Sequence, residues 1–198
     1  MIQINENSYQ DVLFVHIPKT AGSSISLELN RMGLNMWVRN FHMAHDTFQM
    51  LSNNNIIKDS VFKFSVVRNP YTRTYSYYRH FLNIHKFVQS DKSFKDFLSL
   101  IEDNAKPPKT PLISIDQTSY LLNIDNEISL DKIYKFEDLS SLEDDLSITL
   151  PHVNTGGYSK DEYMRVYENE YTVHRVKELF RRDFEMLGYS KDFEKSIV

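Results

Sequence analysis

The sequence predicts an α/β fold in which a central, mostly parallel sheet is flanked by helices. Two apolar strand-like runs, Asp11 to Ile17 and Phe62 to Val67, each lead through a short turn into an amphipathic helical segment. A third strand-like run, Lys132 to Phe136, is again followed by a helical segment. Strands that alternate with helices in this way are typical of layered folds with a parallel sheet. The chain has 198 residues, of which 41% are hydrophobic, which is enough for one substantial core, so we expect a single domain over residues 1–198.

The first half of the chain begins with a buried strand and an amphipathic helix. Asp11 to Ile17 reads as the strand, and a helix from Ser23 to Met32 places Ile25, Leu29 and Met32 on one face. The same reasoning then predicts a short helix from Asp46 to Leu51, a turn at Asn53 to Asn55, the strand Phe62 to Val67, and a long helix from Tyr71 toward Phe87.

The second half alternates short elements with loops and closes on a helix. The predicted elements are a helix from Ser93 to Ile101, an extended loop from Lys106 to Pro111, the strand Lys132 to Phe136, an acidic helix from Asp138 to Leu146, and a flexible stretch from Leu150 to Lys160. The last helix is expected from about Thr172 to Leu187, because Val176, Phe180 and Phe184 form one apolar stripe that stops before Gly188.

The most informative feature for function is the turn between the first strand and its helix, which reads Lys-Thr-Ala-Gly-Ser-Ser. A strand that stops at a Gly-containing turn and restarts as a helix points backbone N–H groups, and the positive end of the helix dipole, into the turn. A lysine charge and three hydroxyls beside those amides suit a tetrahedral anion such as phosphate or sulfate. The candidate ligands are Lys19, Thr20, Ala21, Gly22, Ser23 and Ser24. The alternative is a turn capped by Ser23 or Ser24 that needs no ligand.

A second strand-turn-helix unit indicates a second anionic group on the same ligand. Arg68 falls at the end of the Phe62 to Val67 strand, and Ser76 lies eight residues later, about two helical turns into the next helix. A guanidinium fork and a hydroxyl at these places could bind one phosphate. Taken individually, Arg68 could instead form a surface ion pair and Ser76 could face solvent. Arg73, on the same helix, could support the same phosphate, but a position on the helix surface is the favoured interpretation.

The composition excludes several other classes of protein. The net charge of −4 argues against broad nucleic-acid binding, which usually needs a basic face. The chain contains no cysteine, so it has no disulfide framework. The longest apolar run near the N-terminus is Val12 to Val15, so we expect no signal peptide and no membrane span, and a soluble, cytoplasmic protein. The turn also lacks the Gly-Lys-Ser/Thr ending with which P-loop kinases hold Mg²⁺.

Together these segments resemble sulfotransferases that use 3′-phosphoadenosine 5′-phosphosulfate (PAPS), and in particular the carbohydrate sulfotransferases. The resemblance rests on HIPKTAGSS and VVRNPYTRTYSYY, on AHDTF, DQTSYL, IYKFEDL and LPHVN in the family's order, and on a closing FEMLGY. It covers the chain from about Val12 to Tyr189. Because animal members of this branch usually carry a membrane anchor, the resemblance implies a soluble enzyme of bacterial or viral origin. It implies a P-loop-like, nucleotide-kinase-like topology, PAPS as the donor, no metal, and an acceptor hydroxyl on a carbohydrate or another polar small molecule. It also implies that Lys19 to Ser24 hold the 5′-phosphosulfate, and that Arg68 with Ser76 holds the 3′-phosphate.

Transfer to a hydroxyl needs a base, and FHMAHDTF offers His42 and His45. The unperturbed pKa of histidine lies near neutrality, which suits a general base. The resemblance favours His45, because the family's base histidine precedes a Thr-containing helix start. His42 is the alternative base or a contact in the acceptor groove. Two histidines three residues apart could bind a metal, but no third ligand stands at a telling spacing. Lys19 is expected to stabilise the charge that develops during transfer.

Two other classes of function stay open from the sequence. One is a P-loop-like kinase or nucleotide hydrolase that uses Mg²⁺ with ATP or GTP. The other is a non-catalytic nucleotide-binding domain that kept the anion-binding turn and lost the base. The sequence names neither the acceptor nor the oligomeric state.

Overall fold

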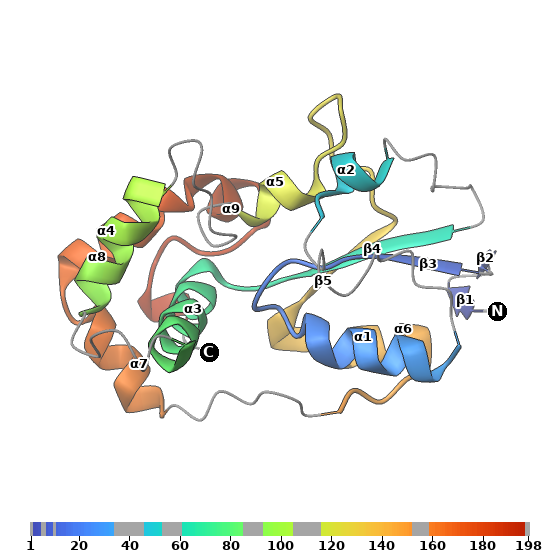
Figure 1. Cartoon of the computed structure of the whole chain (residues 1–198), viewed down its shortest axis with the longest axis horizontal. Helices are drawn as coiled ribbons and strands as arrows, with labels where there is room; N and C mark the ends of the chain where they lie inside the picture. Colours follow the sequence, from blue (N-terminus) through green and yellow to red (C-terminus); the bar gives the residue numbers. More distant parts are fainter. Residues whose placement is uncertain are drawn as a thin grey trace. The chain divides into compact units, whose positions relative to one another are not determined.

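The computed structural model describes residues 2–4, 7–9, 11–33, 46–52, 61–84, 93–104, 116–151 and 159–196. The chain divides into two compact units (Figure 1). Unit 1 comprises Met1–Arg68 and Ser119–Asn154, and unit 2 comprises Asn69–Thr118 and Thr155–Val198. Both units are discontinuous in sequence, because the chain passes between them at residues 68–69, 118–119 and 154–155. The single domain expected over residues 1–198 stays a prediction.

Unit 1 is built on a three-stranded parallel sheet of order β3-β4-β5. The strands are β3 (Asp11–Val15), β4 (Val61–Val67) and β5 (Lys132–Lys135). The register pairs Val15 with Ser65 and Val67 with Lys135, so all three strands end at the same edge of the sheet. The predicted mixed α/β architecture with a parallel sheet is therefore confirmed.

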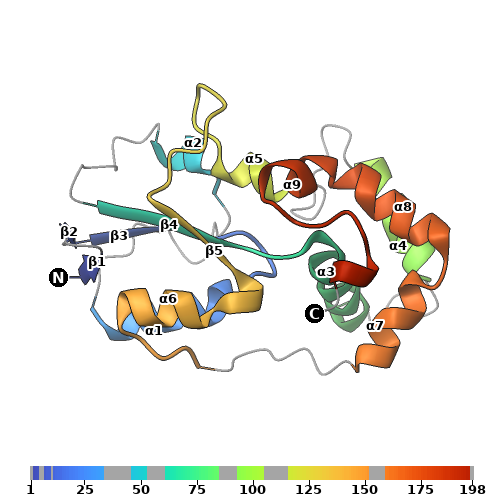
Figure 2. The same cartoon turned by 180° about the vertical axis from the view of Figure 1, so that it is seen from behind.

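Helices cover both faces of this sheet. The helices α1 (Gly22–Arg31) and α6 (Ser140–Leu146) lie along one face, and α2 (Phe48–Ser52) lies over the other (Figures 1 and 2). The first face buries alternate residues of the strands against the two helices. We call this set the unit 1 core: Val12, Phe14, Phe62, Phe64, Val66 and Tyr134 from the strands, and Ile25, Leu29, Leu142, Leu146, Ile148 and Leu150 from α1, α6 and the segment after α6.

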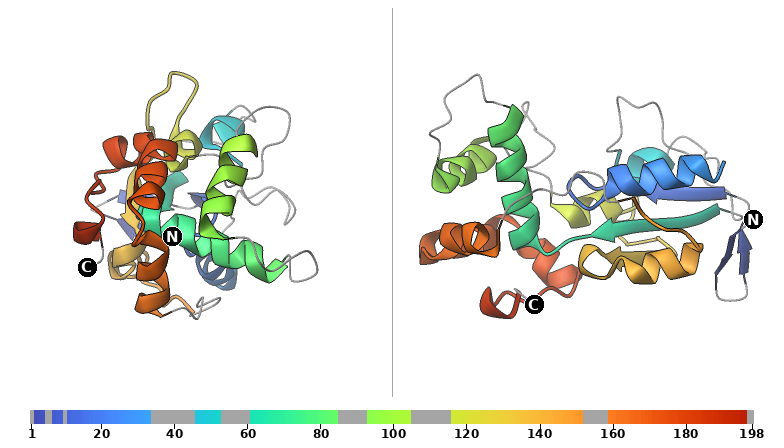
Figure 3. Two further views of the ribbon diagram at one scale, coloured as in Figure 1. Left: turned by 90° about the vertical axis from the view of Figure 1, so that its left-hand side faces the viewer. Right: turned by 90° about the horizontal axis from the view of Figure 1, so that it is seen from below.

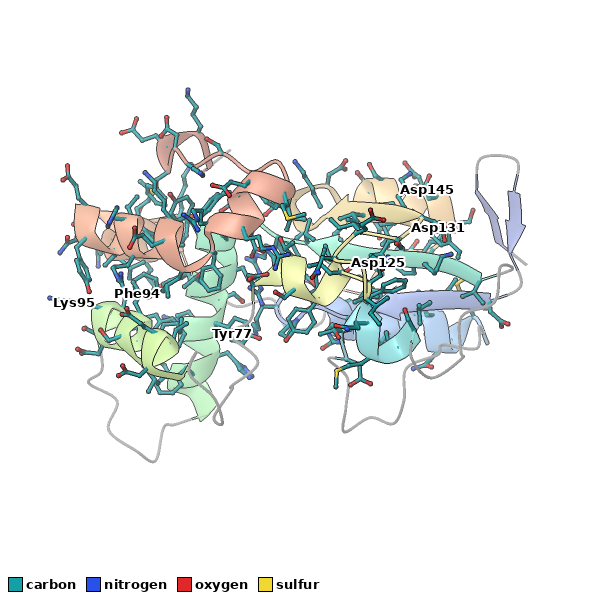
Figure 4. All side chains as sticks on the ribbon, turned by 90° about the horizontal axis from the view of Figure 1, so that it is seen from above. Tyr77, Phe94, Lys95, Asp125, Asp131 and Asp145 are labelled. Atoms are coloured by element: carbon teal, nitrogen blue, oxygen red, sulfur yellow. The ribbon has the colours of Figure 1, made fainter. Side chains whose placement is uncertain are left out.

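Acidic side chains fasten β5 and the strand beside it. Asp131, just before β5, accepts a hydrogen bond from the Lys63 backbone N–H at 2.7 Å (Figure 4). Asp145 on α6 accepts hydrogen bonds from the side chains of Lys132 and Tyr134. Burial, together with the hydrogen bond to Asp145, raises the pKa of Tyr134 above its usual range. The phenol therefore stays a hydrogen-bond donor that links β5 to α6.

Unit 2 is helical and is held together by aromatic rings. Its main helices are α3 (Pro70–Ile84), α4 (Phe94–Asn104), α7 (Lys160–Tyr167), α8 (Glu170–Leu179) and α9 (Arg181–Met186). The helix α8 contacts the other four (Figure 3). Tyr77 extends from α3 and Phe94 from α4 (Figure 4), and Phe94 packs edge to face with Tyr78 and Tyr167 at ring-centre distances of 5.2 Å.

Two short elements complete the described fold. The helix α5 (Gln117–Leu121) carries the chain from unit 2 into unit 1, and β1 (Ile2–Ile4) pairs antiparallel with β2 (Asn7–Tyr9). Neither element was predicted, nor was α7. Three-residue strands and a five-residue helix are too short for a hydrophobic period to be visible.

Two predictions about the helices are wrong. The single closing helix expected from Thr172 to Leu187 is interrupted at Phe180, whose φ of −117° and ψ of 29° lie outside the helical region. Arg73 is not a surface arginine, because its side chain is only 2% exposed and its guanidinium lies over the rings of Tyr77 and Phe180. The predicted loop Lys106 to Pro111 lies outside the described residues.

Candidate anion-binding site

The site predicted from the first turn lies at the carboxyl edge of the unit 1 sheet. The turn of residues 16–21 follows β3, Arg68 follows β4, and Phe136 follows β5. In open parallel sheets, ligands bind at this edge, because the loops that leave neighbouring strands meet there. The sheet therefore brings these three segments to one place although they are far apart in sequence.

The turn holds two non-glycine residues in the left-handed region. Lys19 has a φ of +70° and Ala21 a φ of +67°. Such a conformation costs an L-residue about 1–2 kcal/mol, because its Cβ approaches the following carbonyl oxygen. Strain of this kind is concentrated at binding and catalytic sites. The turn is therefore a candidate site on its geometry alone.

The N-terminus of α1 begins without a side-chain cap. Ala21 is the residue before the helix, its carbonyl accepts from the backbone N–H groups of Ser24 and Ile25, and no side chain caps the helix. The capping by Ser23 or Ser24 that the alternative interpretation of the turn expected is therefore not found. Among the described residues, the backbone N–H groups from Lys19 to Ser23 donate to no protein acceptor. Consecutive N–H groups at a helix N-terminus of this kind bind anions.

The hydroxyls of the turn differ in what they can offer a ligand. Thr20 is fully buried, and its Oγ1 donates to the Ile17 carbonyl at 2.8 Å, so this hydroxyl braces the turn from inside. Ser23 is exposed, whereas Ser24 is buried. Thr20 would therefore contribute its backbone N–H to an anion, and Ser23 is the hydroxyl that solvent and ligand reach.

Gly22 is required by the close approach of His16. A Cβ built on Gly22 would lie 1.8 Å from His16 Nε2 and 1.9 Å from its Cδ2. The imidazole is held there by stacking on Phe14, with ring centres 5.5 Å apart and planes at 16°. The glycine therefore makes room for a side chain, and the imidazole lies against the first residue of α1.

Two cationic side chains come together at the turn. Arg68, only 8% exposed, donates from Nη1 to the Lys19 carbonyl oxygen at 3.2 Å. Burial, and then the charge of Arg68, lowers the pKa of Lys19 below its ordinary value. In the part of the chain that the structure describes, no acidic side chain forms an ion pair with Lys19. Like charges brought together at partly buried positions are costly, and an anion bound between them would offset that cost.

The guanidinium of Arg68 also stacks on an aromatic ring. Its Cζ lies 3.9 Å above the ring centre of Phe136, the first residue of the short helix η1 (Phe136–Asp138) that follows β5. Sequence reasoning did not assign Phe136 to the site. The signal was available, because Phe136 is the last residue of the predicted strand Lys132 to Phe136, and the end of a parallel strand falls at the same sheet edge as the turn and Arg68.

The remaining predicted residues belong to the other unit or lie outside the described residues. Ser76 is partly exposed on α3, in unit 2, whereas Arg68 belongs to unit 1. His42 and His45 lie outside the described residues. Within the described ranges no cluster of three or more His, Asp or Glu side chains could hold a metal ion. No helix of the described residues is long and apolar enough to cross a membrane.

The fold and the turn define an α/β protein with a candidate anion-binding site at the carboxyl edge of a parallel sheet. The sequence profile described as the sulfotransferase family matches residues 3–190, and the chain belongs to that family. The resemblance seen in the sequence is thereby confirmed at the level of the family, and the protein is a transferase.

Comparison with known proteins adds one solved structure. A crystal structure of a sulfotransferase from Alicyclobacillus acidocaldarius aligns with 92% of this chain and 100% of that chain, with a TM-score of 0.44 and 14% sequence identity. This likeness is too distant to support an argument about the site. No curated protein matches the chain significantly.

Proposed function

We propose that this protein transfers a sulfuryl group from PAPS to a hydroxyl of a carbohydrate or another polar small molecule. The observation that carries the proposal is the pairing of Lys19 and Arg68 around a strained turn whose backbone N–H groups lack protein acceptors. PAPS carries a phosphosulfate at one end of the ribose and a phosphate on the 3′-oxygen. A site with an amide-lined turn and a guanidinium beside it suits such a ligand better than a singly phosphorylated one.

Each cation has its own role in the proposed complex. The turn from Lys19 to Ser24 receives the 5′-phosphosulfate through N–H groups, and Lys19 adds a point charge beside the bridging oxygen. Arg68 offers its guanidinium fork to the 3′-phosphate, and Ser76 adds a hydroxyl to the same group. Binding of the 3′-phosphate in this way requires Arg68 and Ser76 to contact the same phosphate group.

The proposed reaction is an in-line displacement at sulfur. The acceptor oxygen forms a new bond to sulfur while the bond from sulfur to the bridging phosphate oxygen breaks, and 3′-phosphoadenosine 5′-phosphate (PAP) leaves. The acceptor proton passes to His45, with His42 as the alternative base. Lys19 and the turn amides stabilise the negative charge that grows on the bridging oxygen. The transferred SO₃ group carries less negative charge than a phosphoryl group, so fixed donors can replace a metal ion here.

The donor is tested by calorimetry with PAP, AMP and Mg-ATP on the wild type and on Arg68→Ala. We expect a clear preference for PAP that is weakened in the variant, because only PAP carries a phosphate on the 3′-oxygen for Arg68. Arg31→Ala is the matched control, since Arg31 lies in the last turn of α1, is exposed, and pairs only with Glu28 among the described residues. Equal affinity of the wild type for PAP and AMP would refute the second phosphate site and the donor with it.

The base is tested by transfer of labelled sulfate from PAPS to a panel of sugars. Removing a general base typically lowers the rate by about 10²- to 10⁴-fold, so His45→Ala should lose transfer to that extent and still bind PAP. His42→Ala separates the two candidates, and His174→Ala, an exposed histidine on α8, is the control. Undiminished transfer by His45→Ala would assign the base elsewhere. PAP binding without transfer to any acceptor would favour a non-catalytic nucleotide-binding domain.

A further inference from the structure

We propose that Phe136 is a positioning residue for the donor site, because it holds the Arg68 guanidinium in place and, through Arg68, fixes the carbonyl of the strained residue Lys19. This inference rests on the proposed function, since it concerns the same site. The inference adds Phe136, which directly follows β5, to a site that is otherwise formed by the loops after β3 and β4.

The first step is the contact between the ring and the guanidinium. A cation within about 6 Å of a ring centre is attracted by the electron-rich face of the ring, and 3.9 Å is well inside that range. The contact fixes the plane of the guanidinium. Because the five N–H donors of arginine lie in that plane, the ring also decides the directions in which Arg68 donates.

The second step leads from Arg68 to the turn. One of those donors, Nη1, is committed to the carbonyl of Lys19 at 3.2 Å. Lys19 is one of the two left-handed residues, so this hydrogen bond holds a peptide that would otherwise relax toward an ordinary conformation. Phe136, Arg68 and the Lys19 carbonyl form a connected chain, which we call the brace.

The third step is the anchoring of Phe136 itself. The ring packs against the unit 1 core, which also includes Tyr134 on β5. Phe136 is therefore held both by its peptide link to β5 and by the packing of its ring against the unit 1 core. The brace is built before any ligand arrives, which reduces the cost of ordering Arg68 on binding.

The test is a double-mutant cycle between Phe136→Leu and Arg68→Ala, read by PAP binding. Leucine keeps an apolar side chain in the core and loses the ring face. We expect Phe136→Leu to weaken PAP binding by about 3- to 10-fold in the wild-type background, the range of a partly buried cation–π contact. We expect no further weakening when Phe136→Leu is added to Arg68→Ala. Phe136→Tyr, which keeps the ring, should restore wild-type affinity.

A merely structural role for the ring predicts different results. Phe81→Leu, at a partly buried phenylalanine on α3, measures the effect of losing a ring from the core of unit 2 and should leave PAP affinity unchanged. Unchanged affinity in Phe136→Leu, or equal weakening with and without Arg68, would overturn the inference.

A second readout separates this inference from the proposed function. The cycle is repeated on urea unfolding of the ligand-free protein, where the stacked pair should show a coupling between the two substitutions. If the wild type fails to prefer PAP over AMP, the donor assignment falls while this coupling still tests the brace. A coupling of zero would refute the brace whatever the ligand.

Discussion

Replacing Gly22 by alanine tests whether the close packing of His16 shapes the anion-binding turn. The added methyl carbon would lie 1.8 Å from Nε2 and 2.5 Å from Cε1 of the His16 ring, about half an ordinary contact distance. Either the ring or the start of α1 must therefore move by more than 1 Å, on the order of the shortfall from van der Waals contact. The ring cannot shift freely, because it stacks on Phe14, which is 1% exposed and itself stacks on Phe64 at 5.0 Å.

The magnitude follows from these contacts. Forcing an extra methyl group into a packed site costs about 1–3 kcal/mol, and losing the stacked pair costs about 0.5–1.5 kcal/mol if the ring swings out instead. Alanine is favoured over glycine in the middle of a helix, but Gly22 is the first residue of α1, so this preference offsets little of the loss. We expect Gly22→Ala to lower the free energy of unfolding by about 1–2 kcal/mol and to weaken PAP binding, because the turn is displaced along with the helix start.

The assay is urea unfolding with calorimetry of PAP, performed on Gly22→Ala, His16→Ala and the double variant. Removing the imidazole removes the clash, so the double variant should be at least as stable as His16→Ala alone. Gly33→Ala is the control: Gly33 has a φ of +65°, and nothing lies within 4 Å of an added Cβ, so it should lose stability through backbone strain and keep its PAP affinity. A Gly22→Ala protein of unchanged stability, or one that His16→Ala fails to rescue, would refute the steric argument.

Three further predictions concern the turn and the buried charges of unit 2. Ala21→Val should lower the free energy of unfolding by about 1–3 kcal/mol, because a β-branched residue is strained at a φ of +67°. Ala21→Gly should stay within about 1 kcal/mol of the wild type in urea unfolding. Equal effects of the two substitutions would contradict backbone strain at this position. Asp183→Asn should lower the stability measured by thermal unfolding by about 3 kcal/mol or more. The buried carboxylate accepts hydrogen bonds from the backbone N–H and Oγ1 of Thr118 and faces the buried charge of Arg73. A loss below about 1 kcal/mol would show that the asparagine amide can replace the carboxylate. PAP affinity should fall as the pH rises through the lowered pKa of Lys19, because the anion favours the charged amine and binding near that pKa takes up a proton. Calorimetry in two buffers of different ionisation enthalpy measures this proton uptake. Lys19→Arg, whose side chain stays charged, should show no proton uptake.

The elements that sequence reasoning predicted correctly have a long, clean hydrophobic period. The Ser23 to Met32 helix was expected from Ile25, Leu29 and Met32. The first two are fully buried in α1, whereas Met32, the residue after the helix, is 40% exposed. The break between α8 and α9 could not be seen in this way. Val176, Phe180 and Phe184 are buried on both sides of it, so the period continues although the helix does not.

Buried charges were equally hidden from the pattern. Arg73 stands where a helix surface was expected, because a charged residue at a single position is most often solvated. Its distant partners are the ring of Phe180 and the charge of Asp183, which join the ring of Tyr77 one turn further along α3. Asp183 in turn accepts hydrogen bonds from the backbone N–H groups of Gln117 and Thr118, at the start of α5. Burial raises the pKa of Asp183, and the Arg73 charge opposes that effect.

For the candidate site, the types of the binding residues could be predicted from the sequence, but the backbone conformation of the turn could not. The motif identified Lys19 and Arg68 as cations near an anion, and the structure brings the two together. Left-handed backbone at a lysine and an alanine has no sequence signal, because such positions usually carry glycine or asparagine. The contact between Arg68 and Phe136 joins the ends of two strands, and only the strand order places them side by side.

The strain at the turn is tied to the charge that the proposed function needs. Glycine at position 19 would relieve the left-handed backbone and would also remove the ammonium group, so at this position strain and charge cannot be separated. At position 21 glycine would relieve strain without loss of charge. The alanine there is explained by packing, because it contacts the unit 1 core through the start of α1. A domain with a net stability of about 5–15 kcal/mol tolerates two such residues only if the rest of the fold holds them. In the proposed site, the brace from Phe136 through Arg68 to the Lys19 carbonyl is the part of the fold that holds the strained turn.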